Sequence, residues 1–152
     1  MDLYLALFLF STLWIGPFWF AMLLHPNAPK THKLMEGPWF FAGPLLLWFL
    51  ILIFDTQGFS NIGASYQANN DALQALAMSF SSKTGFTATW AHVVVGDIFV
   101  TRWIWKKSLE VSMATWKMRM SIFFGIMLMP LGLLLHALFT NKKKVILQTC
   151  SR

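Results

Sequence analysis

Three ionisable side chains interrupt the apolar stretch WAHVVVGDIFVTRW at residues 90–103: His92, Asp97 and Arg102. Placing an aspartate or an arginine at the centre of a membrane helix costs about 2.5–3.5 kcal/mol on insertion scales. Residues kept at that cost usually face the interior of a helical bundle or a cavity. We therefore expect this stretch to line a site between helices.

Asp97 is the most central acidic residue in the apolar segments. A carboxyl group in a dry site can donate or accept a proton, or anchor a group that does. The alternative is a structural role, as a partner of Arg102 or of a hydroxyl group on another helix. The sequence leaves both readings open. Arg102 lies near the end of its segment, where a long side chain can reach the lipid headgroups.

Helical spacing separates His92 from Asp97. At about 100° per residue, positions five apart diverge by roughly 140°, so these two side chains do not share a helix face. His92 instead aligns with Gly96 and Trp103. Each of the two ionisable groups is therefore expected to meet a different neighbouring helix.

A second stripe of small residues lies in residues 121–139, where Gly125, Gly132 and His136 align. Small residues let helix backbones approach closely in lipid. We predict that the stripe containing His92, Gly96 and Trp103 packs against the stripe containing Gly132, which would bring the two histidines into one interior. The alternative is that each histidine is a hydrogen-bonded core residue.

The composition is that of an integral membrane protein. Of 152 residues, 57% are hydrophobic and only 12% are charged, and the mean hydropathy is +0.57. A soluble domain has about a quarter charged residues. Most of the lysines and arginines behind the net charge of +6 lie beside the apolar segments, where they meet lipid headgroups. We therefore predict contact with membrane lipids and no nucleic-acid partner.

Four segments reach or approach the roughly 20 apolar residues that a membrane crossing requires. Each must be helical there, because a lone strand would leave backbone groups unpaired in hydrocarbon. We predict an all-α fold, a four-helix transmembrane bundle forming one integral membrane domain over residues 1–152. The spans are expected at residues 3–24, 38–54, 87–105 and 121–139, followed by a basic tail at 140–152.

The connection between the second and third spans has two parts. Residues 55–70 are rich in glycine and asparagine and are expected to form a loop. Asp71 has the form of a helix N-cap and precedes Leu73, Leu76 and Phe80, which are apolar at helical spacing. We predict a short amphipathic helix that lies on the membrane surface.

Basic residues suggest an orientation. Four spans would put the loops 25–37 and 106–120 on one side, and their lysines and arginines favour the cytoplasmic or stromal side for both. The basic tail would then fall on the opposite side, against the same rule. Residues 3–24 follow no basic segment, so we expect a helix and not a secretion signal. We expect a multi-pass protein of a bacterial or a thylakoid or other plastid membrane.

Three sets of residues keep a recognisable order over nearly the whole chain. They are Pro17-Phe18 with Ala28-Pro29-Lys30, Lys33 and Leu34-Met35-Glu36; Phe80-Ser81-Ser82 with Trp90, His92, Asp97 and Phe99; and Pro130, Gly132 and His136. On these residues the chain resembles the abscisic-acid-deficiency-four-like family, the neoxanthin-synthase-like membrane proteins of carotenoid metabolism.

The resemblance implies a four-helix membrane protein linked to xanthophylls. In plants the family is tied to the conversion of violaxanthin to neoxanthin, in which an epoxide opens and leaves an allene without net redox change. This isomerisation needs an acid at the epoxide oxygen and a base at a ring-adjacent carbon. Asp97, His92 and His136 are the candidates, whether the chain is the isomerase or an accessory to it. No redox cofactor and no metal cluster is expected.

A binding role competes with the enzymatic one. As a pigment-carrying subunit of a photosynthetic complex, the chain would bind chlorophyll through His92 or His136, or carotenoid against aromatic side chains such as Trp90 and Trp103. The expected partners are then a pigment and subunits of that complex. A small proton-coupled transporter is a third candidate, suggested by the predicted position of Asp97 inside the membrane.

Overall fold

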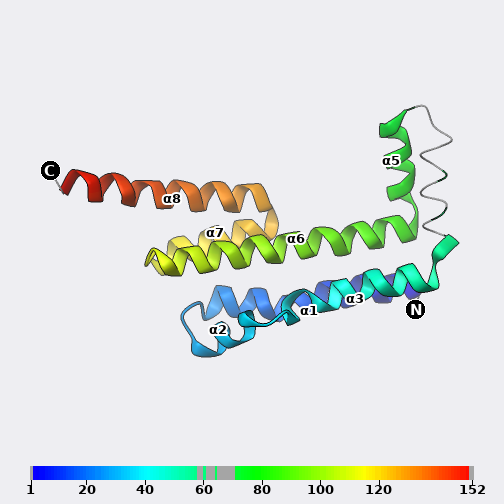
Figure 1. Cartoon of the computed structure of the whole chain (residues 1–152), viewed down its shortest axis with the longest axis horizontal. Coiled ribbons are helices and arrows are strands. Elements are labelled where there is room, and N and C mark those ends of the chain that lie inside the picture. The colour runs from blue at the N-terminus through cyan, green and yellow to red at the C-terminus, as the bar shows by residue number, and fades with distance from the viewer. Residues whose placement is uncertain (1, 58–59, 61–63, 65–70, 151–152) are drawn as a thin grey trace. The chain divides into compact units, whose positions relative to one another are not determined.

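The computed structural model describes residues 2–57, 60, 64 and 71–150, and of residues 142–150 it describes only the backbone. The described residues are largely helical and contain no strand, so the predicted all-α class is confirmed. Most of the predicted loop at 55–70 and the last two residues of the predicted tail lie outside the described residues. The helices are α1 (Leu3–Leu24), α2 (Pro29–Glu36), α3 (Trp39–Phe54), α5 (Ala72–Ser81), α6 (Lys83–Glu110), α7 (Thr115–Met127) and α8 (Met129–Cys150) (Figure 1).

Three of the predicted spans correspond to single helices. The first has the bounds of α1, the second begins one residue before α3, and the third lies inside the longer α6. Within the described residues, two helical stretches are long and apolar enough to cross a membrane: Leu3–Leu24, and Pro29–Phe54, which contains α2 and α3. Crossing of the membrane by four helices stays a prediction.

The prediction of one helix over residues 121–139 is wrong. Helix α7 ends at Met127, Leu128 is extended with φ −151° and ψ 94°, and α8 begins at Met129. Pro130 lies in the first turn of α8, where its missing N–H leaves no hydrogen bond unmade. The apolar run therefore folds into two helices separated by one extended residue.

Glycines let α7 and α8 touch backbone to backbone. A Cβ on Gly132 would lie 2.3 Å from the Cα and 2.5 Å from the N of Gly125. On its other side Gly125 faces α6, because a Cβ there would lie 3.0 Å from Thr101 Cγ2. The close backbone contact of Gly132 is therefore with Gly125 and not with Gly96. The predicted contact between the two stripes is made instead by Trp103 and His136, whose ring centroids lie 5.4 Å apart.

The chain divides into two compact units. The first comprises residues 1–15 and 41–95, and the second comprises residues 16–40 and 96–152. In the first unit, the core joins α3 to the N-terminal half of α6. It consists of Leu47, Ile51, Ala88 and Ala91, with Leu7 and Trp48 packed against it.

Side-chain donors bind the connection between α1 and α3 in the second unit. Carbonyl groups at helix ends and in turns have no helical partner and need one from elsewhere. Three are satisfied by α6 and α7: Trp105 Nε1 donates to Pro26 O at 2.9 Å, Arg102 Nε to Met35 O at 2.8 Å and Arg119 Nη2 to Leu24 O at 2.8 Å. This unit is therefore held by polar bonds at the end where α1 stops and α2 begins.

The predicted short helix before the third span is confirmed as α5, and Asp71 is its N-cap. The Asp71 carboxylate accepts from the N–H of Leu73 at 2.9 Å. The buried side chains of α5 are Ala75 and Ser79, while the predicted apolar face, including Leu73 at 75% exposure, is open. Contact of this face with a membrane surface stays a prediction.

Candidate functional site

His136 is the one sequence-predicted candidate whose imidazole is buried in the second unit. It lies on α8, 5% exposed, and its Nδ1 is 3.2 Å from Ser108 Oγ on α6. The ring of Trp103 meets the imidazole edge-on, with centroids 5.4 Å apart. The predicted candidates His136 and Trp103 are therefore neighbours, while Ser108, which orients the imidazole, was missed.

Asp97 lies half-buried on α6 in the same unit. Thr101 Oγ1 donates to the backbone carbonyl of Asp97 at 2.7 Å, and Trp19 Nε1 donates to Thr101 Oγ1 at 3.1 Å. Among the described residues, the Asp97 carboxylate makes no hydrogen bond or ion pair. Arg102 does not pair with it, because its guanidinium bonds to Met35 O and stacks 4.9 Å from the ring centroid of Phe40.

Trp90 and His92 belong to the first unit. The indole N–H of Trp90 donates to Thr12 Oγ1 at 2.9 Å, and its ring packs on Phe8 with centroids 5.1 Å apart. His92 is exposed on α6. The common interior predicted for His92 and His136 stays a prediction, because the two belong to different units.

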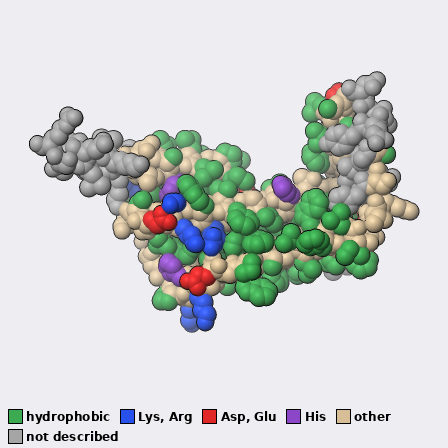
Figure 2. All heavy atoms as spheres, viewed as in Figure 1, with side chains coloured by type: hydrophobic (Ala, Val, Ile, Leu, Met, Phe, Trp, Pro, Cys, Tyr) green, Lys and Arg blue, Asp and Glu red, His purple; other side chains and the backbone are tan. Residues whose placement is uncertain are grey.

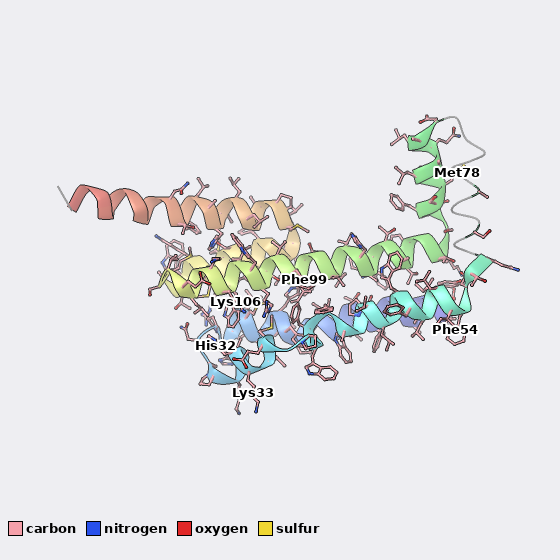
Figure 3. The ribbon with its side chains drawn as sticks, viewed as in Figure 1. His32, Lys33, Phe54, Met78, Phe99 and Lys106 are labelled. Atoms are coloured by element: carbon pink, nitrogen blue, oxygen red, sulfur yellow. The ribbon has the colours of Figure 1, made fainter. Side chains whose placement is uncertain are left out.

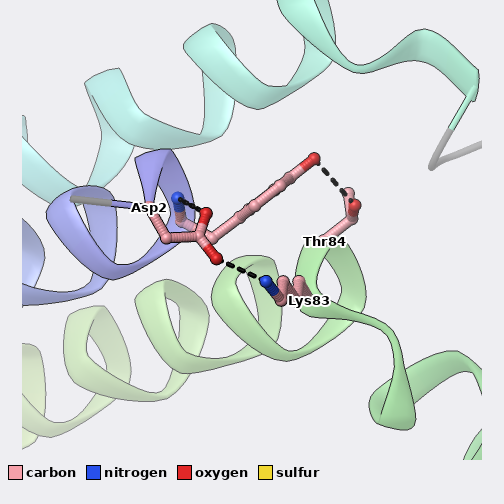
Figure 4. A network of polar contacts seen from close by, with 4 residues as sticks. Asp2, Lys83 and Thr84 are labelled. Carbon is pink, nitrogen blue, oxygen red and sulfur yellow. Dashed lines mark hydrogen bonds and ion pairs between the residues drawn. The ribbon is translucent and has the colours of Figure 1, made fainter.

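A polar cluster that the sequence reading did not single out occupies one end of the first unit. The hydroxyl groups of Tyr4 and Thr84 both donate to the carboxylate of Asp55. Thr84 Oγ1 also lies 3.2 Å from the phenolic oxygen of Tyr4 (Figure 4). Tyr4 is in the first turn of α1, Asp55 directly follows α3, and Thr84 is in the first turn of α6. We call Tyr4, Asp55 and Thr84 the Asp55 cluster.

The Asp55 cluster opens onto an apolar cavity. The cavity has a volume of about 230 Å³, and Tyr4 and Asp55 are its polar walls. Its remaining walls come from α1 and α3: Leu3, Leu7, Leu50, Ile51 and Phe54. Thr84 is buried at 6% exposure. A carboxylate and a phenol therefore face a space that accepts an apolar molecule.

An ion pair lies beside the cluster. The Lys83 ammonium group binds the carboxylate of Asp2, and the N–H of Tyr4 donates to Asp2 Oδ1 at 3.2 Å (Figure 4). The bond from Lys83 is the main cause that holds the pKa of Asp2 below its ordinary value of 3.8, and the same bond raises the pKa of Lys83. Both groups are exposed, so the ion pair joins the starts of α1 and α6 without enclosing charge and contributes little stability.

One sequence signal could have found the Asp55 cluster. Three consecutive crossings would place the start of the first span, the end of the second and the start of the third on one membrane side. Tyr4, Asp55 and Thr84 occupy these three positions. In the part of the chain that the structure describes, no group of three or more His, Cys, Asp or Glu side chains is placed to hold a metal ion.

A family model described as ABA DEFICIENT 4-like matches residues 6–136. The chain belongs to the ABA DEFICIENT 4-like family. The resemblance identified from the sequence is thereby confirmed. The chain is also 26% identical over 145 residues to the protein ABA DEFICIENT 4, chloroplastic, of Arabidopsis thaliana. This alignment covers 91% of the chain but 64% of the Arabidopsis protein. No solved structure matches the chain.

The ABA DEFICIENT 4-like region contains both sets of candidate residues, with one exception. Asp97, His92 and His136 lie within it, as do Asp55 and Thr84. Tyr4 precedes it. Asp55, whose carboxylate lies in a cavity wall, is therefore within the family region.

Proposed function

We propose that this chain is a multi-pass integral membrane protein of xanthophyll metabolism that isomerises an epoxide end ring to an allene. Membership of the ABA DEFICIENT 4-like family and the two long apolar helical stretches support the setting. The observation that carries the reaction is the Asp55 cluster, in which a carboxylate and two hydroxyl groups meet at an apolar cavity.

The place of the cluster suits this substrate class. Tyr4, Asp55 and Thr84 all lie at helix ends, which meet the headgroup region when α1, α3 and α6 cross a membrane. A xanthophyll is a long apolar chain with oxygen-bearing end rings, and those rings favour the same region. The cavity accepts one ring, and the chain of the pigment extends along the lipid-facing helices.

The reaction moves one proton. The Asp55 carboxylate removes a proton from the chain carbon next to the ring, the epoxide C–O bond breaks, and the phenol of Tyr4 protonates the departing oxygen. The product has the composition of the substrate and carries a hydroxyl group and an allene. The Tyr4–Asp55 hydrogen bond then returns the proton from the carboxyl group to the phenolate, and Thr84 positions the carboxylate.

Asp97, His92 and His136, the acid–base candidates predicted from the sequence, are the alternative to the Asp55 cluster in this reaction. Asp97 lies in the middle of α6 and not at a helix end, where an oxygenated ring is expected. His136 donates to or accepts from Ser108 and is enclosed. The proposal therefore assigns the first proton transfer to Asp55. Asp97 is the alternative base with which Asp55 is compared by mutation.

Pigment analysis in a host that accumulates an epoxy-xanthophyll tests the assignment. The wild-type chain is expected to produce the allenic isomer. Asp55→Asn removes the base and is expected to lower the yield about a hundredfold or more, the scale of general acid–base catalysis. Chromatography of the extracted pigments measures the yield of the allenic isomer for the wild-type chain and for Asp55→Asn.

Asp71→Asn is the matched control. Asp71 is an exposed N-cap, and asparagine caps helices as well as aspartate does. This variant is expected to give the wild-type pigment profile. An unchanged profile with the wild-type chain would refute the isomerase, and a wild-type profile with Asp55→Asn would remove the cluster from the reaction.

Pigment binding without catalysis is the second candidate, favoured by the exposed imidazole of His92. A neutral imidazole can be an axial ligand of a metal ion such as the magnesium of chlorophyll. This candidate predicts a coloured purified protein that loses chlorophyll absorption in His92→Ala. A colourless protein that still converts the epoxide would reject it.

A further inference from the structure

The pair α7 and α8 forms a hairpin whose turn is a single residue. Helix α7 ends at Met127 and α8 begins at Met129, so Leu128 alone connects them. The two helices then pack against each other. Direct contact between the backbones of Gly125 and Gly132 holds them together. The two helices are therefore in close contact directly beside the turn.

Both backbone polar groups of the turn residue, Leu128, are bonded within the hairpin. The N–H of Leu128 donates to Phe124 O at 2.7 Å, and its carbonyl accepts from the N–H groups of Leu131 at 2.9 Å and Gly132 at 3.2 Å. An unpaired backbone group in hydrocarbon costs several kcal/mol, so loops are normally kept out of it. Both polar groups of the one extended residue are bonded within the hairpin, so Leu128 itself adds no unpaired backbone group.

The side chains at the turn are apolar and open. Met127 is 60% exposed and Leu128 61%. From Met120 to Asn141 the sequence has no aspartate, glutamate, lysine or arginine. Basic residues stand only at the open end of the hairpin. They are Lys117 and Arg119 at the start of α7 and Lys142, Lys143 and Lys144 in α8.

Neither arm reaches the length of a membrane crossing before its first basic residue. Leu128 lies nine positions after Arg119 and fourteen positions before Lys142. At 1.5 Å per residue these distances are about 14 Å and about 21 Å, against roughly 30 Å of hydrocarbon. A Cβ on Gly96 would lie 3.4 Å from Met129 Cε, so the turn lies beside the midpoint of the 28-residue helix α6. If α6 crosses the bilayer, the turn therefore lies near the middle of the bilayer.

We propose that α7 and α8 form a re-entrant hairpin, inserted from the basic side, whose turn is covered by the lipid hydrocarbon. The end of α8 then lies on the same side as the α6–α7 connection. The inference rests on the membrane setting of the proposed function, though not on its chemistry.

Charge distribution supports this topology. With three crossings and a re-entrant hairpin, the loops and the lysines of α8 share one side, and the conflict with the positive-inside rule disappears. Lys83 is then the only lysine or arginine before Lys144 on the other side, where Asp2, Asp55 and Asp71 lie. Figure 2 shows blue basic side chains gathered over the end of the second unit that holds α2, and Figure 3 labels Lys33 and Lys106 there.

Cysteine labelling in sealed vesicles of known orientation tests the topology. Cys150 is the only cysteine, so it reports the end of α8 in the wild-type chain. In a Cys150→Ser background, Ala114→Cys reports the α6–α7 connection and Ala72→Cys reports α5, both at exposed positions. A membrane-impermeant maleimide is expected to label Cys150 from the face that labels Ala114→Cys, and Ala72→Cys from the opposite face.

Labelling of Cys150 from the face of Ala72→Cys would overturn the hairpin and restore a fourth crossing. A chain that carbonate washing releases from the membrane would instead refute the membrane setting, so the two failures are distinguishable.

A spin label on Leu128→Cys, in the same Cys150→Ser background, tests what covers the turn. Collisions with oxygen are expected to be frequent, and collisions with a water-soluble nickel complex are expected to be lost, whereas Ala114→Cys shows the reverse. Frequent nickel collisions at Leu128→Cys would contradict burial in lipid. Disulfide-linked dimers of this variant on oxidation would show a second copy in place of hydrocarbon and would equally overturn the proposal.

Discussion

At the scale of the residue, the imidazole of His136 depends on a single hydroxyl group. Ser108→Ala leaves Nδ1 of a buried ring without its partner, which costs about 1–3 kcal/mol of stability. Denaturant unfolding in detergent measures the loss. Ser81→Ala is the control, because Ser81 is exposed and its hydroxyl donates to a neighbouring carbonyl, Met78 O. Equal unfolding midpoints for the two variants would show that the Ser108 bond carries no stability.

The residue scale also explains which candidates the sequence could and could not supply. Asp97 and His136 stand out because a charged or polar residue inside an apolar run is conspicuous. Asp55 does not, because it directly follows its apolar run and looks like an ordinary helix end. Its environment is made by Tyr4 and Thr84, which lie 51 and 29 residues away in the chain.

At the scale of the element, the backbone contact between Gly125 and Gly132 decides whether α7 and α8 form a hairpin. Gly132→Ala puts a methyl group 2.3 Å from a Cα, so a helix must shift, and overpacking of this kind costs about 1–3 kcal/mol. Gly16→Ala is the control, because a Cβ there meets nothing within 4 Å, and alanine favours a helix interior by about 0.5–1 kcal/mol.

Thermal unfolding in detergent is expected to move in opposite directions for these two variants. A Gly132→Ala protein as stable as the wild-type chain would show that the helices are not in backbone contact.

Hydropathy predicted the positions of the first helices, but it did not predict the turn at Leu128 between α7 and α8. The predicted bounds of α1 are those observed, and α3 differs by one residue, because both are uniformly apolar. Residues 121–139 are just as apolar, and a crossing helix and a hairpin have the same composition. The choice of Gly125 and not Gly96 as the close partner of Gly132 depends on tertiary packing.

At the scale of the whole molecule, two conclusions depend on the membrane setting. The Asp55 cluster belongs to the end of the first unit, which carries acidic residues, and the hairpin belongs to the second unit, whose open end is basic. The proposed topology of three crossings and a re-entrant hairpin predicts that the reaction occurs on the membrane side opposite the basic loops.

The measurement that tests the central claim most directly is conversion of an epoxy-xanthophyll by the purified protein in lipid nanodiscs. The wild-type chain is expected to form the allenic isomer without added cofactor. Asp55→Asn is expected to slow conversion by about 10²–10⁴-fold, and Asp97→Asn by less. Conversion by Asp55→Asn at the wild-type rate would contradict the account, whatever the rate of Asp97→Asn.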